Sequence, residues 1–83
     1  MTLDLRNIRE TVREIQMFLL EISYLENELY RVSMDGFYGK ETSDAVRLFQ
    51  DSRGIPATGS VDFATWQLLF LAYTAAREIR ISE

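Results

Sequence analysis

The chain lacks two residue types that carry much of protein chemistry, because none of its 83 residues is cysteine or histidine. Without cysteine there can be no disulfide, no thiolate metal ligand and no thiol nucleophile. Without histidine the commonest general base and the commonest zinc ligand are also missing. We therefore expect no cofactor and no metal site, and only carboxylate pairs remain for acid–base catalysis.

Positive charge is also scarce. The 9 Lys and Arg residues are outnumbered by 13 Asp and Glu residues, which gives a net charge of −4. Nucleic-acid binding is driven mainly by basic side chains that contact phosphates. The charge balance therefore disfavours nucleic acid as a partner.

No long apolar run is present. The richest one, residues 68–73, is far shorter than the roughly 20 residues that span a bilayer, so we expect no membrane partner. The first residues also lack the basic end and apolar stretch of a signal peptide. If the chain acts outside a cell, we expect export as part of a larger protein, or release by lysis.

The composition that remains is that of one small globular domain. Apolar residues make up 47% of the chain, which is too many for a disordered tail. A chain this short buries only about 60% of its unfolded surface, so its stability should be modest. We expect a single domain over residues 1–83.

Helical periodicity accounts for most of the apolar residues and predicts an all-α, three-helix bundle. The helices are expected from Asn7 to about Glu28, from after Gly39 to about Arg53, and from Phe63 to about Arg80. The third is apolar on more than one side and would need more than one partner. Its inward face should contain Trp66, Leu69, Phe70, Tyr73 and Ala76, with Leu68, Leu71 and Ala72 off that face.

Two similar glycine turns introduce the second and third helices. Gly59 follows Gly36 by 23 positions, and each is followed by a helix start and then by a threonine. Glycine is favoured at such turns because it accepts positive φ. Gly54 is expected to end the second helix, and Pro56 to prevent it from resuming.

The first turn also carries Phe37 and Tyr38 between two glycines. Adjacent aromatic residues on a short loop either fill the core or present rings to a ligand. We expect Phe37 in the core, whereas Tyr38 is open between packing and ligand contact. Asp35 is expected to serve mainly as a turn former and only secondarily as a ligand contact. Trp66 is expected to anchor the core.

Several short segments share their order and spacing with one family. They are Ile15-Gln16 with Leu19, Ile22 and Tyr24; Asp35-Gly36-Phe37-Tyr38-Gly39; Gly54-Ile55-Pro56; and Thr58-Gly59, Val61-Asp62, Thr65-Trp66 and Leu69. Together they resemble the bacterial peptidoglycan-binding domain, the small three-helix module of many cell-wall hydrolases. The resemblance spans residues 8–70.

The resemblance implies a non-catalytic module that holds a parent protein on peptidoglycan, in a cell-wall, phage- or spore-associated setting. A polymer of sugars and peptides suits a shallow groove with aromatic faces and a few hydrogen-bonding groups. Tyr38 offers a ring with a polar tip, and Arg53 could hold a stem-peptide carboxylate in a bidentate pair. The expected ligand-binding residues are Asp35, Tyr38, Gln50 and Arg53.

The chain departs from the family pattern in three places. Ser23 replaces the usual glycine, which predicts that the first helix runs past Tyr24. Residues 25–34 form a longer link that could extend the helix or add a turn. Residues 71–83 extend the third helix beyond the family-like core.

Two other functions compete with peptidoglycan binding. Catalysis is disfavoured, because the only carboxylate pair worth testing is Asp35 with Asp62 and both have turn or capping duties. The alternative function is docking through the apolar third helix, with a fused or neighbouring catalytic domain or with a second copy in a weak homodimer.

Overall fold

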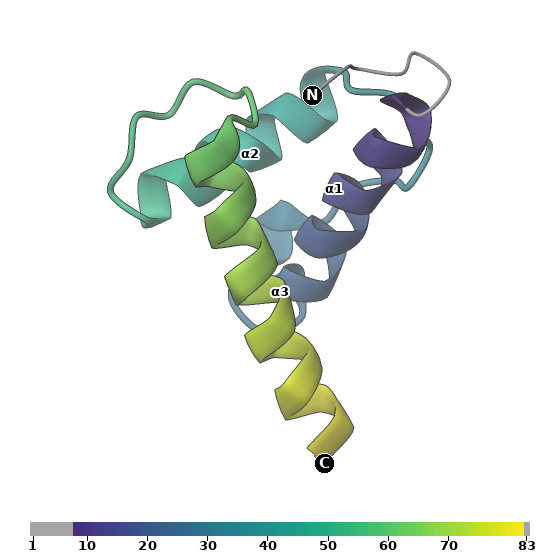
Figure 1. Cartoon of the computed structure of the whole chain (residues 1–83), viewed down its shortest axis with the longest axis vertical. Coiled ribbons are helices and arrows are strands. Elements are labelled where there is room, and N and C mark those ends of the chain that lie inside the picture. The colour runs from purple at the N-terminus through teal and green to yellow at the C-terminus, as the bar shows by residue number, and fades with distance from the viewer. Residues whose placement is uncertain (1–7, 83) are drawn as a thin grey trace.

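The computed structural model describes residues 8–82, and it describes the side chains of residues 8–79. Within this range the chain is all-helical, which confirms the predicted fold class (Figure 1). None of the helices found there is long and apolar enough to cross a membrane. The expected helix start at Asn7 and the side chain of Arg80 lie outside the described residues. The elements are α1 (Ile8–Ser23), η2 (Glu28–Tyr30, a 3-10 helix), α2 (Lys40–Ser52) and α3 (Phe63–Ser82).

The first helix ends earlier than the sequence indicated. It stops at Ser23 rather than running past Tyr24 to about Glu28. The Ser23 hydroxyl donates to the Leu20 carbonyl oxygen at 2.5 Å. Because such a bond occupies a backbone acceptor of the last turn, it competes with continuation of the helix. The helix therefore ends at the position where the family pattern has glycine.

The longer link after α1 adds a turn instead of extending the helix. Asn27 caps η2, and its Oδ1 accepts from the Leu29 amide at 2.9 Å. This short helix buries Tyr30, whose ring packs edge-on against Phe49 with centroids 5.9 Å apart. The link therefore supplies a core side chain that lies between α1 and α2.

The second helix ends as predicted. Gly54 has φ of 73°, and its amide donates to the Asp51 carbonyl at 3.1 Å. The Ile55 amide donates to the Gln50 carbonyl at 3.2 Å. This pair of bonds is the Schellman motif, which satisfies the last carbonyls of a helix and favours glycine.

The third helix packs along α1 (Figure 1), but its buried stripe differs from the expected one. Leu69 and Ala76 are buried as predicted, whereas Phe70 is 48% exposed and Ala72 is buried. Thr65 completes a stripe with helical spacing, so the buried face is rotated away from Phe70.

Acid should weaken the fold through Asp62. Its Oδ1 accepts from the Thr65 amide at 2.8 Å and so caps α3. Bonds from the Thr65 amide and hydroxyl hold the pKa of Asp62 below its usual value of 3.8. This stabilisation is present above that value and is lost as the pH falls through the lowered pKa.

We therefore expect the free energy of unfolding to fall as the pH drops below about 4. Asp62→Asn keeps an oxygen acceptor at the cap but cannot titrate, so it should show a smaller fall. Urea titrations followed by circular dichroism between pH 7 and pH 2 measure both. Identical pH profiles for the two proteins would show that titration of Asp62 does not contribute to the loss of stability in acid.

Candidate functional site

The first glycine turn is held by a buried glutamine of α1. Gln16 has no exposed surface, and its Nε2 donates to Asp35 Oδ1 (3.1 Å) and Thr42 Oγ1 (3.0 Å). Nε2 also donates to the Phe37 carbonyl (3.0 Å), while Oε1 accepts from the Gly36 amide (2.9 Å). A buried amide is costly unless it is hydrogen-bonded, so this set of bonds fixes the turn on α1.

The second turn is held in the same way by Gln50 of α2. Its Nε2 donates to the Ser60 carbonyl (2.9 Å) and Thr65 Oγ1 (3.0 Å), and its Oε1 accepts from the Gly59 amide (2.9 Å). Gln50 is only 1% exposed. This burial weighs against the predicted ligand-binding role, because the side chain has almost no surface to offer and its amide is already bonded. The role itself stays a prediction.

The two glutamines make the repeated turns structurally equivalent. Gly36 and Gly59 both have positive φ, at 75° and 80°. Thr42 and Thr65 occupy matching places, and each accepts from one glutamine. We call Gln16 and Gln50, with their bonds to the two turns, the glutamine clamps. The sequence analysis did not predict them. The signal that could have identified them is an apolar–glutamine pair on each preceding helix, Ile15-Gln16 and Phe49-Gln50.

Phe37 lies on the surface, so the expectation that it fills the core was wrong. Its side chain is 72% exposed. Its amide donates to Asp35 Oδ1 (2.9 Å) and its carbonyl accepts from Gln16, so the backbone faces α1 and the side chain stays outside. The ring lies against Gly39, where a Cβ would be 2.6 Å from Phe37 Cε1. Phe37 therefore presents an exposed aromatic ring that lies on the backbone of Gly39, where no side chain intervenes.

Tyr38, by contrast, connects the two turns. It is half-buried against the core, and its hydroxyl donates to the Gly59 carbonyl at 2.5 Å. Burial raises the pKa of Tyr38, and the nearby Arg47 opposes that rise. The phenol therefore stays protonated and acts as a hydrogen-bond donor. Most of the Tyr38 side chain serves packing between the two turns rather than contact with a ligand.

The exposed part of the first turn forms one wall of a shallow hollow of about 500 Å³. The start of α1 forms the other wall, and the Arg9 side chain passes over Gly36, where a Cβ would be 2.5 Å from Arg9 Cγ. Bonds from the Phe37 amide and the Gln16 side chain hold the pKa of Asp35 below its usual value, and Arg9 adds to this effect. We call this region the loop surface; it consists of Ile8, Arg9, Asp35, Gly36 and Phe37.

Arg53 lies away from the loop surface. It follows the last residue of α2, while Tyr38 precedes the first, so a helix of 13 residues separates them. That length corresponds to about 20 Å. Its Nη1 and Nη2 donate to the Glu26 carboxylate at 2.6 and 2.7 Å, and the resulting bond raises the pKa of Arg53. The carboxylate that Arg53 holds therefore belongs to the chain itself.

The structure thus divides the four expected site residues. Asp35 and Tyr38 lie together on the first turn, and Gln50 reaches the same region from inside through Gly59. Arg53 does not join them. The arrangement offers an exposed ring and a carboxylate on a fixed turn, with a cation from α1 beside them, which suits binding of a polar polymer.

Comparison with known protein families identifies a match that covers most of the chain. The family model described as "Putative peptidoglycan binding domain" matches residues 9–69. No curated protein and no solved structure matches the chain. The matched range includes both glycine turns and both glutamine clamps, and it ends within α3 at Leu69.

Proposed function

The chain belongs to the peptidoglycan-binding domain family, and from this membership we propose that it is a non-catalytic module that holds a larger cell-wall-acting protein on peptidoglycan. The family match over residues 9–69 is the observation that carries the proposal. A module of this kind works at the cell wall. Weak single sites suit such a role, because a repetitive polymer supplies many equivalent attachment points.

The loop surface is the place where we propose that the polymer binds. Phe37 supplies an exposed face on which the C–H groups of a sugar or peptide can pack. Arg9 and the exposed carboxylate of Asp35 flank that ring and can bond to amides, hydroxyls or a carboxylate of the polymer. Of the four residues expected from the sequence, we retain Asp35 as a contact and Tyr38 as the residue that fixes the loop beside it.

The carboxylates of the chain support a binding role over a catalytic one. Asp35 accepts from Gln16 and from the Phe37 amide, and Asp62 caps α3. Bonds to the charged form lower both pKa values, whereas a general acid needs a raised pKa. Each carboxylate therefore maintains a turn or a cap.

Binding to purified, protein-free sacculi tests the proposal directly. We expect the domain to sediment with sacculi and to remain in the supernatant with an equal mass of cellulose. Cellulose controls for trapping in an insoluble polysaccharide. Equal recovery in the supernatant with and without sacculi would rule the proposal out.

Gly39→Ala should weaken this binding without unfolding the domain. Gly39 has φ of −106° and ψ of −159°, which alanine can adopt, but the new Cβ would collide with the Phe37 ring. The ring must move, so we expect a severalfold loss of sacculus affinity. Gly39 is also the N-cap residue of α2, and alanine caps less well than glycine, so the free energy of unfolding should fall by about 1 kcal/mol while the domain stays folded. In a Phe37→Ala background the same substitution should cause no further loss of affinity. An equal loss of affinity in both backgrounds would show that Gly39→Ala does not act through the Phe37 ring.

Docking through α3 is the second candidate function, and one observation favours it. Leu71 is 64% exposed and Ile79 is 44% exposed, and with the exposed Ala75 they recur every fourth residue. An apolar stripe of this kind can pair with another helix. Sedimentation equilibrium tests this candidate, because a second copy on the stripe would give a dimer that Leu71→Glu dissociates. A monomer at every concentration would remove self-association as the function.

A further inference from the structure

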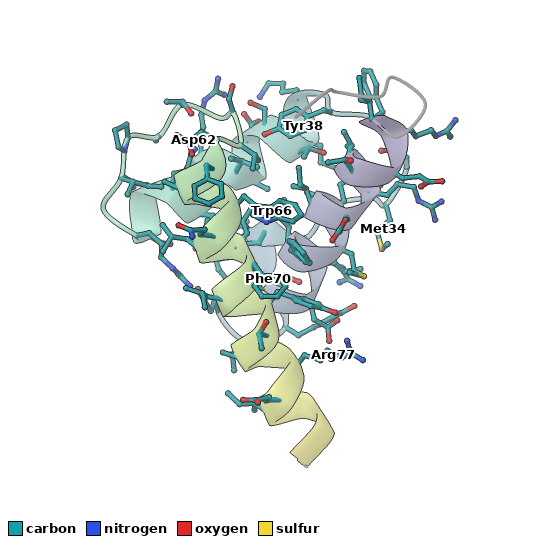
Figure 2. All side chains as sticks on the ribbon, in the orientation of Figure 1. Met34, Tyr38, Asp62, Trp66, Phe70 and Arg77 are labelled. Atoms are coloured by element: carbon teal, nitrogen blue, oxygen red, sulfur yellow. The ribbon has the colours of Figure 1, made fainter. Side chains whose placement is uncertain are left out.

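A stripe of partly exposed aromatic side chains runs along α3 beside α1. Trp66, Phe70 and Tyr73 recur at spacings of four and three residues, so they share one side of the helix. Figure 2 shows Trp66 and Phe70 between α3 and α1, with Arg77 further toward the C-terminal end. We call Trp66, Phe70 and Tyr73 the aromatic stripe.

The stripe rests on a rigid base. Phe18 of α1 is 2% exposed, and its ring centroid lies 5.1 Å from Trp66, 6.0 Å from Phe70 and 4.7 Å from Tyr73. Such tilted and edge-on contacts hold aromatic rings in fixed orientations. Phe70 nevertheless remains 48% exposed, so its ring has a free surface as well as a packed one.

Two hollows flank Phe70 along the helix. One, of about 160 Å³, is lined by Trp66, Gln67, Phe70 and Leu71. The other, of about 360 Å³, is lined by Phe70, Tyr73, Thr74, Arg77 and Glu78. With a rise of 1.5 Å per residue, the backbone positions that carry the three rings are spaced by about 6 Å and about 4.5 Å along the helix axis, which is comparable to the length of a sugar residue.

The rim of the hollows is polar but balanced in charge. Gln67 and Thr74 are exposed and uncharged, and Arg77 and Glu78 contribute one charge of each sign. Arg77 Nη1 donates to the Tyr73 hydroxyl oxygen at 3.1 Å, which leaves the phenolic proton able to donate to a ligand. A neutral, hydroxyl-rich chain matches this rim better than a charged peptide does.

We propose that the aromatic stripe binds a strand of β-linked N-acetyl amino sugars, the glycan of peptidoglycan, as a second contact separate from the loop surface. Sugar C–H faces would pack on the Phe70 and Trp66 rings, and hydroxyl and acetamido groups would bond to Gln67, Arg77 and Glu78. The inference rests on the proposed function, because it names the part of the polymer that one surface of the module contacts. A chain that spans both surfaces would be held more tightly than by either alone.

Trp66 provides the test, because it is the only tryptophan of the chain. Titration with the β-1,4-linked tetramer of N-acetylglucosamine should change its fluorescence in a saturable manner. Phe70→Leu keeps the apolar packing on Phe18 but removes the flat ring, so affinity for the tetramer should fall about tenfold. The matched control is Phe63→Leu, because Phe63 is 74% exposed on the same helix and lines neither hollow. The control should bind like the wild type.

The outcome is distinguishable from failure of the proposed function. If the domain sediments with sacculi but the tetramer leaves Trp66 fluorescence unchanged, the glycan site on α3 is overturned and peptidoglycan binding stands. Equal losses in Phe70→Leu and Phe63→Leu would also overturn it. A tenfold loss confined to Phe70→Leu, with an unchanged circular dichroism melt, would support the site.

Discussion

Phe18→Ala is expected to lower the free energy of unfolding by about 4 kcal/mol, the largest effect of any single substitution considered. Phe18 is 2% exposed and contacts Trp66, Phe70 and Tyr73, so its loss opens a cavity between α1 and α3. Small domains have total stabilities of about 5–15 kcal/mol. The variant should therefore be only marginally folded at room temperature.

Urea unfolding followed by circular dichroism and by Trp66 fluorescence measures this loss. Trp66 lies 5.1 Å from Phe18 between ring centroids, so its emission should also shift in the folded variant. Phe63→Ala is the matched control, because the same side chain is removed from a position that is 74% exposed. A loss below about 1 kcal/mol for Phe18→Ala would show that α1 and α3 do not pack as described.

Gln50→Leu is expected to cost about 3 kcal/mol, although leucine is similar in size and apolar. The substitution leaves the Gly59 amide without its partner and removes the bond to the buried Thr65 hydroxyl. The Ser60 carbonyl also loses its bond from Gln50 and keeps only the one from the Thr58 hydroxyl. A buried donor or acceptor without a partner costs more than the same bond contributes when it is made. The second turn should therefore loosen, and α3 with it.

Gln67→Leu is the control for this prediction, because Gln67 is exposed on α3 and should tolerate the change. Gln67→Leu controls for stability only, because Gln67 lines a hollow beside the aromatic stripe. Sacculus binding by Gln50→Leu, compared with that of the wild type, separates the two roles considered for Gln50. A scaffold residue lowers stability, whereas a ligand contact lowers sacculus affinity in a protein of normal stability. Wild-type stability together with lost binding would restore Gln50 to the ligand site.

The turns and caps of this fold follow from the sequence because each depends on local chemistry. Gly54 ends α2 since only a residue that accepts positive φ closes the Schellman bonds. Asp62 caps α3 through a bond to the residue three positions later. Such features need no knowledge of the remote chain, and the order of motifs around them was enough to indicate the family.

The assignment of side chains to core or surface was less predictable. Phe37 and Tyr38 are adjacent, and either could have entered the core. The choice is made by Gln16, which lies more than twenty positions upstream of Phe37 and accepts or donates at three points of the turn. Likewise, the rotation of α3 that exposes Phe70 and buries Ala72 depends on packing against α1. In both cases tertiary contacts determine which side chain is buried, and the periodicity of the sequence does not predict those contacts.

The measurement that tests the central claim most directly compares sacculus binding by Phe37→Ala and Phe63→Ala. Both remove a phenylalanine that is more than 70% exposed, 72% at Phe37 and 74% at Phe63, but only Phe37 belongs to the loop surface. Depletion isotherms with protein-free sacculi should show about a tenfold loss of affinity for Phe37→Ala and none for Phe63→Ala. Wild-type binding by Phe37→Ala, with both variants folded by circular dichroism, would contradict the claim that the loop surface binds peptidoglycan.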